Sequence, residues 1–166
     1  VDIILDTAGQ KGPGLWTAVS ALEVGSPAQT ITQAVFARSL SSFKQERVTA
    51  SAILDGPERI DYSEQQKQQI IAELHDALYC SKICAYAQGF QLMAIASKEK
   101  GWSLDFAAIA KIWRAGCIIR AVFLQDITKA FLDNEQLQNL LLDPFFSGQI
   151  TKFQMNWRKS IANATL

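Results

Sequence analysis

The chain has 166 residues, 49% of them hydrophobic, and its 16 basic side chains balance 16 acidic ones. This length allows one domain with a substantial core, and the zero net charge gives no basic excess for binding nucleic acid. The longest apolar region, residues 77–96, is interrupted by a lysine and several polar side chains. A buried helix is therefore predicted there, and not a membrane span.

The most informative segment is the glycine-rich loop at residues 6–14, because it places Lys11 directly before a helix that starts near Trp16. Glycines let backbone N–H groups turn toward an anion, and a helix N-terminus adds unpaired donors. The spacing matches neither a Walker loop nor the dinucleotide-binding fingerprint. The loop indicates a site for a phosphate or carboxylate; the alternative is a connecting turn with an exposed lysine, which such spacing marks more often.

A second candidate residue follows from the next predicted helix. Ser26 and Pro27 are typical of a helix start, with serine as N-cap and proline at the first position. The helical spacing then places Arg38 on the same face as Ile31 and other apolar residues. A guanidinium among apolar neighbours needs a counter-charge, which is either a carboxylate of the protein or an anionic ligand. Both alternatives stay open, and Arg38 joins Lys11 as a candidate.

The middle of the chain predicts one long helix. Asp55-Gly56-Pro57 breaks the preceding pattern, and Ser63 with Gln66 forms a capping box. From there helical spacing runs to about Lys98, so a rod of about 35 residues would be about 50 Å long. Small residues in its second half allow close packing. We expect this helix to run through the middle of a bundle or a dimer interface.

Shorter helical pieces follow the long helix. They are expected at residues 103–114 after a stop at Gly101, at 117–132, at 137–142, and from Asp143-Pro144 onward. No convincing strand or internal repeat is present. The pattern predicts an all-α fold, in which residues 1–166 form a single multi-helix bundle domain with one long central helix.

The cysteines indicate the cellular compartment, and the chain ends indicate whether the chain is part of a longer protein. Cys80, Cys84 and Cys117 make an odd count without secretory features, so reduced thiols in a soluble, cytoplasmic protein are expected. Cys80 and Cys84 lie near His75, but no fourth ligand or recognised spacing accompanies them, so no metal is predicted. The chain begins without methionine and stops inside a helical pattern, which we interpret as a piece of a longer protein.

Several segments share a pattern with one enzyme family. They include Leu5 to Gly12 (LDTAGQKG) with Trp16-Thr17-Ala18, Ala34 to Ser42 (AVFARSLSS), Ile112 to Arg120 (IWRAGCIIR), and parts of residues 77–90 and 137–143. In order and over nearly the whole chain, they resemble the C-terminal all-helical domain of decarboxylating 6-phosphogluconate dehydrogenases.

The resemblance implies an activity for the full-length protein. The family oxidises 6-phosphogluconate with NADP to ribulose 5-phosphate and carbon dioxide, without a metal, in the pentose phosphate pathway. It works as a cytoplasmic homodimer whose active site is shared between subunits. Its general-base lysine, general-acid glutamate and Rossmann domain lie upstream of the matching region, and its substrate-binding tail lies downstream. This chain is thus expected to hold no catalytic residue and to be inactive alone.

Two residues carry over as substrate-binding positions, namely Lys11 and Arg38, each expected near the substrate phosphate. Two departures accompany them, because Pro13 stands where the family usually has threonine and Leu15 where it commonly has lysine. The alternatives are a helical dimerisation module without a working phosphate site, and a related 3-hydroxyacid dehydrogenase. Other cations are assigned structural roles: Arg114 and Arg120 in ion pairs or carbonyl contacts, and Lys82 in capping or pairing.

Overall fold

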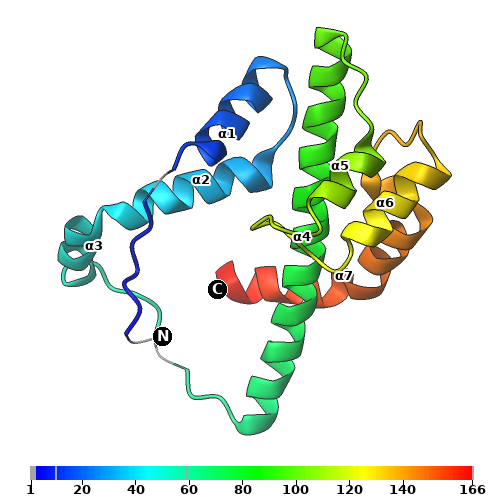
Figure 1. The fold of residues 1–166 in the computed structure, drawn as a ribbon. Coiled ribbons are helices and arrows are strands. Elements are labelled where there is room, and N and C mark those ends of the chain that lie inside the picture. The colour runs from blue at the N-terminus through cyan, green and yellow to red at the C-terminus, as the bar shows by residue number, and fades with distance from the viewer. Residues whose placement is uncertain (1–2, 10, 59, 166) are drawn as a thin grey trace.

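The computed structural model describes residues 3–9, 11–58 and 60–165, which form helices and turns without any strand. The predicted all-α class is confirmed (Figure 1). The elements are α1 (Pro13–Glu23), α2 (Gln29–Ser42), α3 (Lys44–Ser51), α4 (Glu64–Lys100), α5 (Phe106–Ile112), α6 (Leu124–Asp133), the 3-10 turn η1 (Leu140–Leu142) and α7 (Pro144–Thr165). Within the described ranges, no helix has the length and apolar character needed to cross a membrane.

Helix α4 is the long helix that the sequence predicts, and both of its ends form as expected. The Ser63 hydroxyl accepts a hydrogen bond from the Gln66 backbone N–H at 3.3 Å, and the Gln66 side chain accepts one from the Ser63 N–H at 2.9 Å. At the other end Gly101 adopts a left-handed conformation with φ 68°. The helix has 37 residues, and these caps satisfy backbone groups that would otherwise lack partners.

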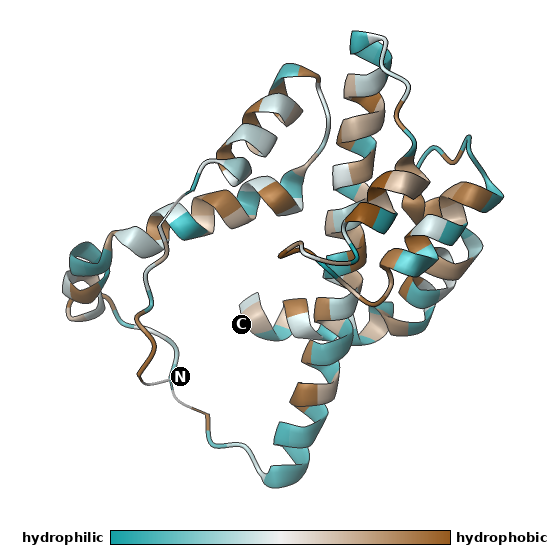
Figure 2. Ribbon diagram, viewed as in Figure 1, coloured by the Kyte–Doolittle hydropathy of each residue, from teal (hydrophilic) through white to brown (hydrophobic). Residues whose placement is uncertain are grey.

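The core lies on one side of the second half of α4, where α5, α6, η1 and α7 pack (Figures 1 and 2). Phe123 stands at its centre, with edge-to-face contacts to Tyr79 and Tyr86 at centroid distances of 6.0 and 5.1 Å. Outside this core, the Asn156 amide of α7 donates to the Asp76 carboxylate of α4 at 2.7 Å. We call the helices from α4 to α7, with the turns between them, the body.

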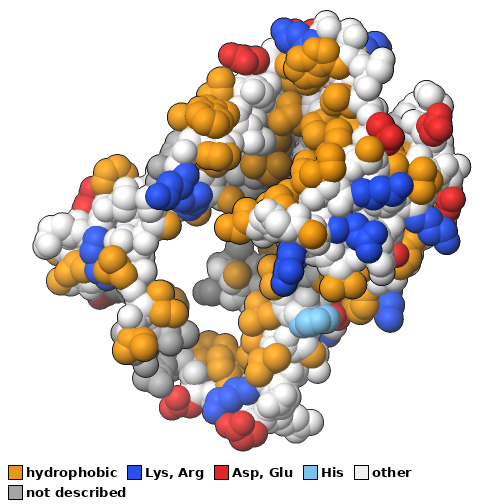
Figure 3. Space-filling model, in the orientation of Figure 1, with side chains coloured by type: hydrophobic (Ala, Val, Ile, Leu, Met, Phe, Trp, Pro, Cys, Tyr) orange, Lys and Arg blue, Asp and Glu red, His pale blue; other side chains and the backbone are white. Residues whose placement is uncertain are grey.

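Helices α1 to α3 form an arm that leaves the body near the middle of α4 (Figure 1). The join is small: Thr30 and Gln88 exchange two hydrogen bonds of 3.0 and 3.1 Å, beside a cluster of Ala21, Ala28 and Leu92. Neither α2 nor α3 buries any residue. The space-filling view shows open space between the arm and the lower half of α4 (Figure 3).

Two predicted helix starts are wrong, and local contacts explain why. The Ser26 N–H donates to the Ala21 carbonyl at 2.7 Å, so Ser26 closes the turn after α1, and α2 begins only at Gln29. The predicted cap at Ser103 moves to Asp105, whose carboxylate accepts from the Ala108 N–H at 2.8 Å.

The helix predicted from residue 117 begins only at Leu124, because residues 113–123 form a series of turns. Gly116 takes a positive φ of 67°. The Tyr86 hydroxyl then donates to the Ile119 carbonyl and holds the segment against α4. The positive φ of Gly116 and this long-range hydrogen bond accompany the turns, so here the tertiary arrangement prevails over the local pattern.

Candidate functional site

The glycine-rich loop leads into α1 as predicted, and Gly12 is the residue at which the chain enters the helix. Gly12 is the N-cap with φ 109°, a conformation that side chains disfavour, and a Cβ there would lie 3.1 Å from the Trp16 ring. Pro13 occupies the first helical position, and no side chain among the described residues caps this end. Lys11 is exposed and makes no hydrogen bond or ion pair within the described residues. The N-terminal backbone donors of α1 and a full positive charge therefore lie next to each other along the chain.

Arg38 lies against this loop, but not in the environment that the sequence predicts. The expected apolar face is only partly covered, since Ile31 and Val35 are half-buried while Ala34 and Arg38 are exposed. The partner of Arg38 is also different, since its guanidinium donates from Nη2 to the backbone carbonyl of Gly9. A carbonyl takes one of the five donors of an arginine. The structure thus brings Arg38 to the segment that carries Lys11, and no carboxylate of the described residues pairs with its charge.

An ion-pair cluster that sequence reasoning missed fixes the start of the loop. The Asp6 carboxylate lies 2.5 Å from Lys44 Nζ and 2.9 Å from Arg47 Nη1. Arg47 also donates to the backbone carbonyls of Asp6 and Ser41, both at 3.0 Å. The Ala8 N–H donates to the Ser41 hydroxyl at 3.0 Å. The available signal was an acidic residue just before the glycine-rich loop together with the basic residues Lys44 and Arg47 after the second helix, α2.

These contacts shift the ionisation of Asp6. Hydrogen bonds from Arg47 first and Lys44 second hold the pKa of the Asp6 carboxyl well below its usual range. The carboxylate stays charged at neutral pH and ties the loop to α3. As a result, residues 6–9 have a defined path across α2 toward Lys11.

Three cations assigned structural roles lack the expected partners. In the described residues, the side chains of Lys82, Arg114 and Arg120 form no ion pair or hydrogen bond. Lys82 instead places Nζ 5.8 Å from the centre of the Phe123 ring. Among the described residues, Arg114 and Arg120 thus show neither the ion pairs nor the carbonyl contacts assigned to them.

The thiols and the histidine were considered as metal ligands. No group of three or more His, Cys, Asp or Glu side chains with suitable placement occurs among residues 3–9, 11–58 and 60–165. His75 lies 3.1 Å from the Asp76 carboxylate. Burial raises the pKa of the Cys80 and Cys84 thiols, so both are held in the unreactive protonated form.

Comparison with known proteins places the chain in one family. The family model described as "6-phosphogluconate dehydrogenase, C-terminal domain" matches residues 1–166. A decarboxylating 6-phosphogluconate dehydrogenase of Schizosaccharomyces pombe is 54% identical over 166 residues, which is 100% of this chain and 33% of the yeast protein. One from Staphylococcus epidermidis is 51% identical over 164 residues, 99% of this chain and 35% of the bacterial protein.

The fold has a solved counterpart. A Plasmodium falciparum 6-phosphogluconate dehydrogenase, described in its apo form, with its cofactor NADP+ and with its substrate 6-phosphogluconate, superposes with a TM-score of 0.91. Its sequence is 41% identical, and the match covers 99% of this chain and 35% of that one. The chain thus spans about a third of the length of these relatives.

Proposed function

The chain belongs to the 6-phosphogluconate dehydrogenase family as its C-terminal domain, and from this premise we propose its role in the whole protein. It binds 6-phosphogluconate for an NADP-dependent oxidative decarboxylation that yields ribulose 5-phosphate and carbon dioxide. The observation that carries this proposal is the loop-and-helix arrangement at Lys11 and Arg38, where among the described residues neither cation has a carboxylate partner and no side chain caps the N-terminus of α1.

In this proposal Lys11 and Arg38 hold the phosphate end of the substrate. A guanidinium presents paired N–H donors that match two phosphate oxygens, and the lysine adds a point charge. The Asp6 cluster positions the loop and does not touch substrate. Because Pro13 has neither a hydroxyl nor an N–H, the contacts that a threonine would supply there are lost.

The acid–base chemistry and the cofactor are assigned to other parts of the whole protein. The described residues form no β-sheet with a glycine-rich turn, so they do not fit a dinucleotide of the NADP type. No residue of this chain is proposed as a catalytic acid or base. When bound by the whole protein, NADP would accept the hydride, and this domain would orient the substrate.

The same domain is also proposed to contribute to a homodimer in which the active site is shared. Large apolar side chains are exposed along the arm, including Leu22, Phe36 and Leu40. Several large apolar side chains exposed on neighbouring helices favour a face that another chain or segment covers. This observation also favours the second candidate function, a dimerisation module without a working phosphate site.

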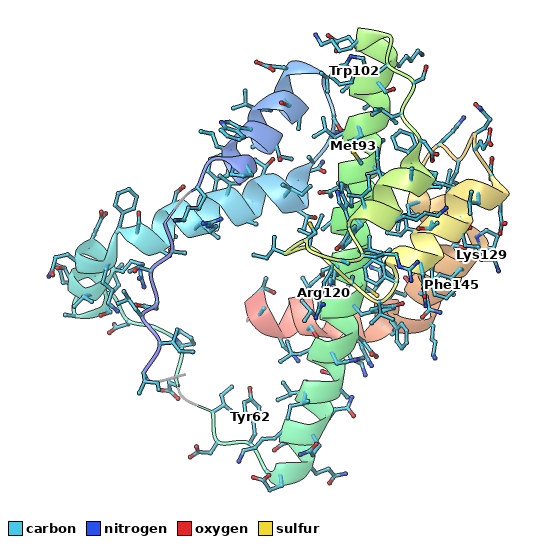
Figure 4. All side chains as sticks on the ribbon, viewed as in Figure 1. Tyr62, Met93, Trp102, Arg120, Lys129 and Phe145 are labelled. Atoms are coloured by element: carbon cyan, nitrogen blue, oxygen red, sulfur yellow. The ribbon has the colours of Figure 1, made fainter. Side chains whose placement is uncertain are left out.

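Calorimetric titration of 6-phosphogluconate into this chain distinguishes the two candidates. We expect saturable binding that weakens with added salt, and a loss of about tenfold or more in affinity for Lys11→Ala and for Arg38→Ala. Lys129→Ala, an exposed lysine on α6 (Figure 4), is the matched control and should bind as the parent does. Equal affinity in all four proteins, or no binding in any, would leave only the dimerisation module.

A further inference from the structure

A second group of cations lies on the body, away from the loop of Lys11. Lys82, Arg114, Arg120 and Gln125 line a hollow of about 500 Å³ together with Ala121 and Val122. A neighbouring cavity of about 400 Å³ shares Lys82 and Arg120. Figure 4 labels Arg120 beside the middle of α4, and Figure 3 shows Lys and Arg side chains gathered on this face of the body.

The neighbouring hollow is almost wholly apolar and open to solvent, since Ile118 and Ile119 at its edge are 99% and 42% exposed. Apart from its two shared cations and Thr17, its walls are aromatic, aliphatic or glycine: Ile31, Ala85, Tyr86, Gly89, Trp113, Ile118 and Ile119. It lies at the join of arm and body, since α1, α2, α4 and the turns after α5 all contribute. The two hollows together form a pocket that is apolar at one end and positive at the other.

The charges at the positive end are not neutralised by the described protein. No Asp or Glu lines either hollow, and none of the three cations has an ion-pair partner. Three like charges that converge on one hollow repel each other, and a bound anion removes that repulsion. This arrangement differs from an ordinary solvated surface, on which charges of both signs alternate.

The scaffold under these cations is held by defined contacts. The Tyr86 hydroxyl donates to the Ile119 carbonyl, and the Arg120 N–H donates to the Cys117 carbonyl at 3.2 Å. Phe123 is 5% exposed and supports both the Tyr86 ring and the Lys82 ammonium. The turns that carry Arg120 are thereby fixed to α4, which carries Lys82, so the backbones of both residues keep their positions at the mouth of the apolar hollow.

We propose that this pocket binds an aryl phosphate, meaning a phosphate monoester with a flat apolar ring. The ring lies in the apolar cavity against Tyr86 and Trp113, where aromatic faces stack favourably. The phosphate lies between Arg114 and Arg120, whose planar donors match its oxygens, with Lys82 alongside. A polyhydroxylated sugar acid does not suit the apolar end, because its hydroxyls would lose hydrogen bonds to water there. The site is thus distinct from the one proposed at Lys11 and Arg38.

Trp113 supplies a direct readout of this proposal. In 15N-labelled protein each of the four tryptophan indoles gives its own N–H signal, and Trp113→Phe identifies the one in the pocket. Phenyl phosphate should shift the Trp113 signal saturably. It should bind about tenfold more tightly than inorganic phosphate or glycerol phosphate, since only it buries a ring. Benzoate, which carries one charge, should bind more weakly than phenyl phosphate.

Variants separate the site from other phosphate contacts. Arg120→Gln and Arg114→Gln should each weaken phenyl phosphate binding about tenfold, while Lys129→Gln and Lys11→Ala should leave it unchanged. Matching thermal unfolding midpoints would show that the variants remain folded. An unmoved Trp113 signal, equal affinity for phenyl and inorganic phosphate, or loss of binding in Lys11→Ala would each overturn the proposal. The last result would assign the phosphate to the Lys11 loop, and would leave the proposed function intact.

Discussion

Asp6 is the residue on which the geometry of the loop depends, although it is not proposed to touch a ligand. Its carboxylate joins Lys44 and Arg47, and Arg47 reaches on to the Ser41 carbonyl. Asp6→Asn would remove the charge while keeping the size. We expect 6-phosphogluconate to bind several-fold more weakly to this variant in a calorimetric titration, because the loop before Lys11 loses its anchor. Glu58→Gln, an exposed carboxylate without an ion pair among the described residues, is the control.

The same carboxylate has a defined pH dependence. Arg47 and Lys44 lower the pKa of the Asp6 carboxyl in the folded chain. Its contribution to the stability of the fold is therefore fully present above the unfolded pKa of about 4, and it is lost as the pH falls further. The Ala8 amide, which donates to Ser41, reports the loop. Its NMR signal should stay unchanged from pH 7 to about 4 and move only below that. Movement centred near pH 6 would contradict this assignment.

At the scale of elements, Gly12 decides how α1 begins. An alanine there would combine an unfavourable φ of 109° with a Cβ 3.1 Å from the Trp16 ring. We expect Gly12→Ala to destabilise the chain by about 1–3 kcal/mol in urea unfolding, and to weaken substrate binding by displacing the N-terminal donors. Gly9→Ala is the matched control, since nothing lies within 4 Å of its added Cβ and its φ is not positive. Equal stability of the two variants would show that the start of α1 can rearrange to accept a side chain at position 12.

The elements also show what sequence alone could predict. Ser63, Gln66 and Gly101 act through neighbours in sequence, so the limits of α4 were readable within two residues. The turns before α6 were not, because the Tyr86–Ile119 hydrogen bond joins residues 33 positions apart. The contacts of the two candidate site residues differ in the same way, local for one and long-range for the other. Lys11 followed from local glycine chemistry, whereas the true partner of Arg38, the Gly9 carbonyl 29 positions away, had no sequence pattern.

At the scale of the whole molecule, arm and body differ in how much of their apolar surface is covered. The body encloses a core around Phe123 and Phe146, which are 5% and 0% exposed. The arm has no such core, and Leu22 and Phe36 are 78% and 64% exposed. Burial of apolar area is the main driving force for association, so we expect the arm to take part in assembly, although the body also exposes Ile118 and Val122, at 99% and 88%.

Light scattering on the isolated chain tests this inference. We expect a mass above that of the 18.4 kDa monomer at high protein concentration, because association removes the exposed apolar side chains of the arm from water, which is favourable. Phe36→Asp should shift the chain toward monomer, since a carboxylate cannot be buried there without a partner. Val122→Asp, equally apolar and 88% exposed but on the body, should leave the mass unchanged. A clean monomer at all concentrations would contradict assembly through the arm, and a response to Val122→Asp instead would move the interface to the turns before α6.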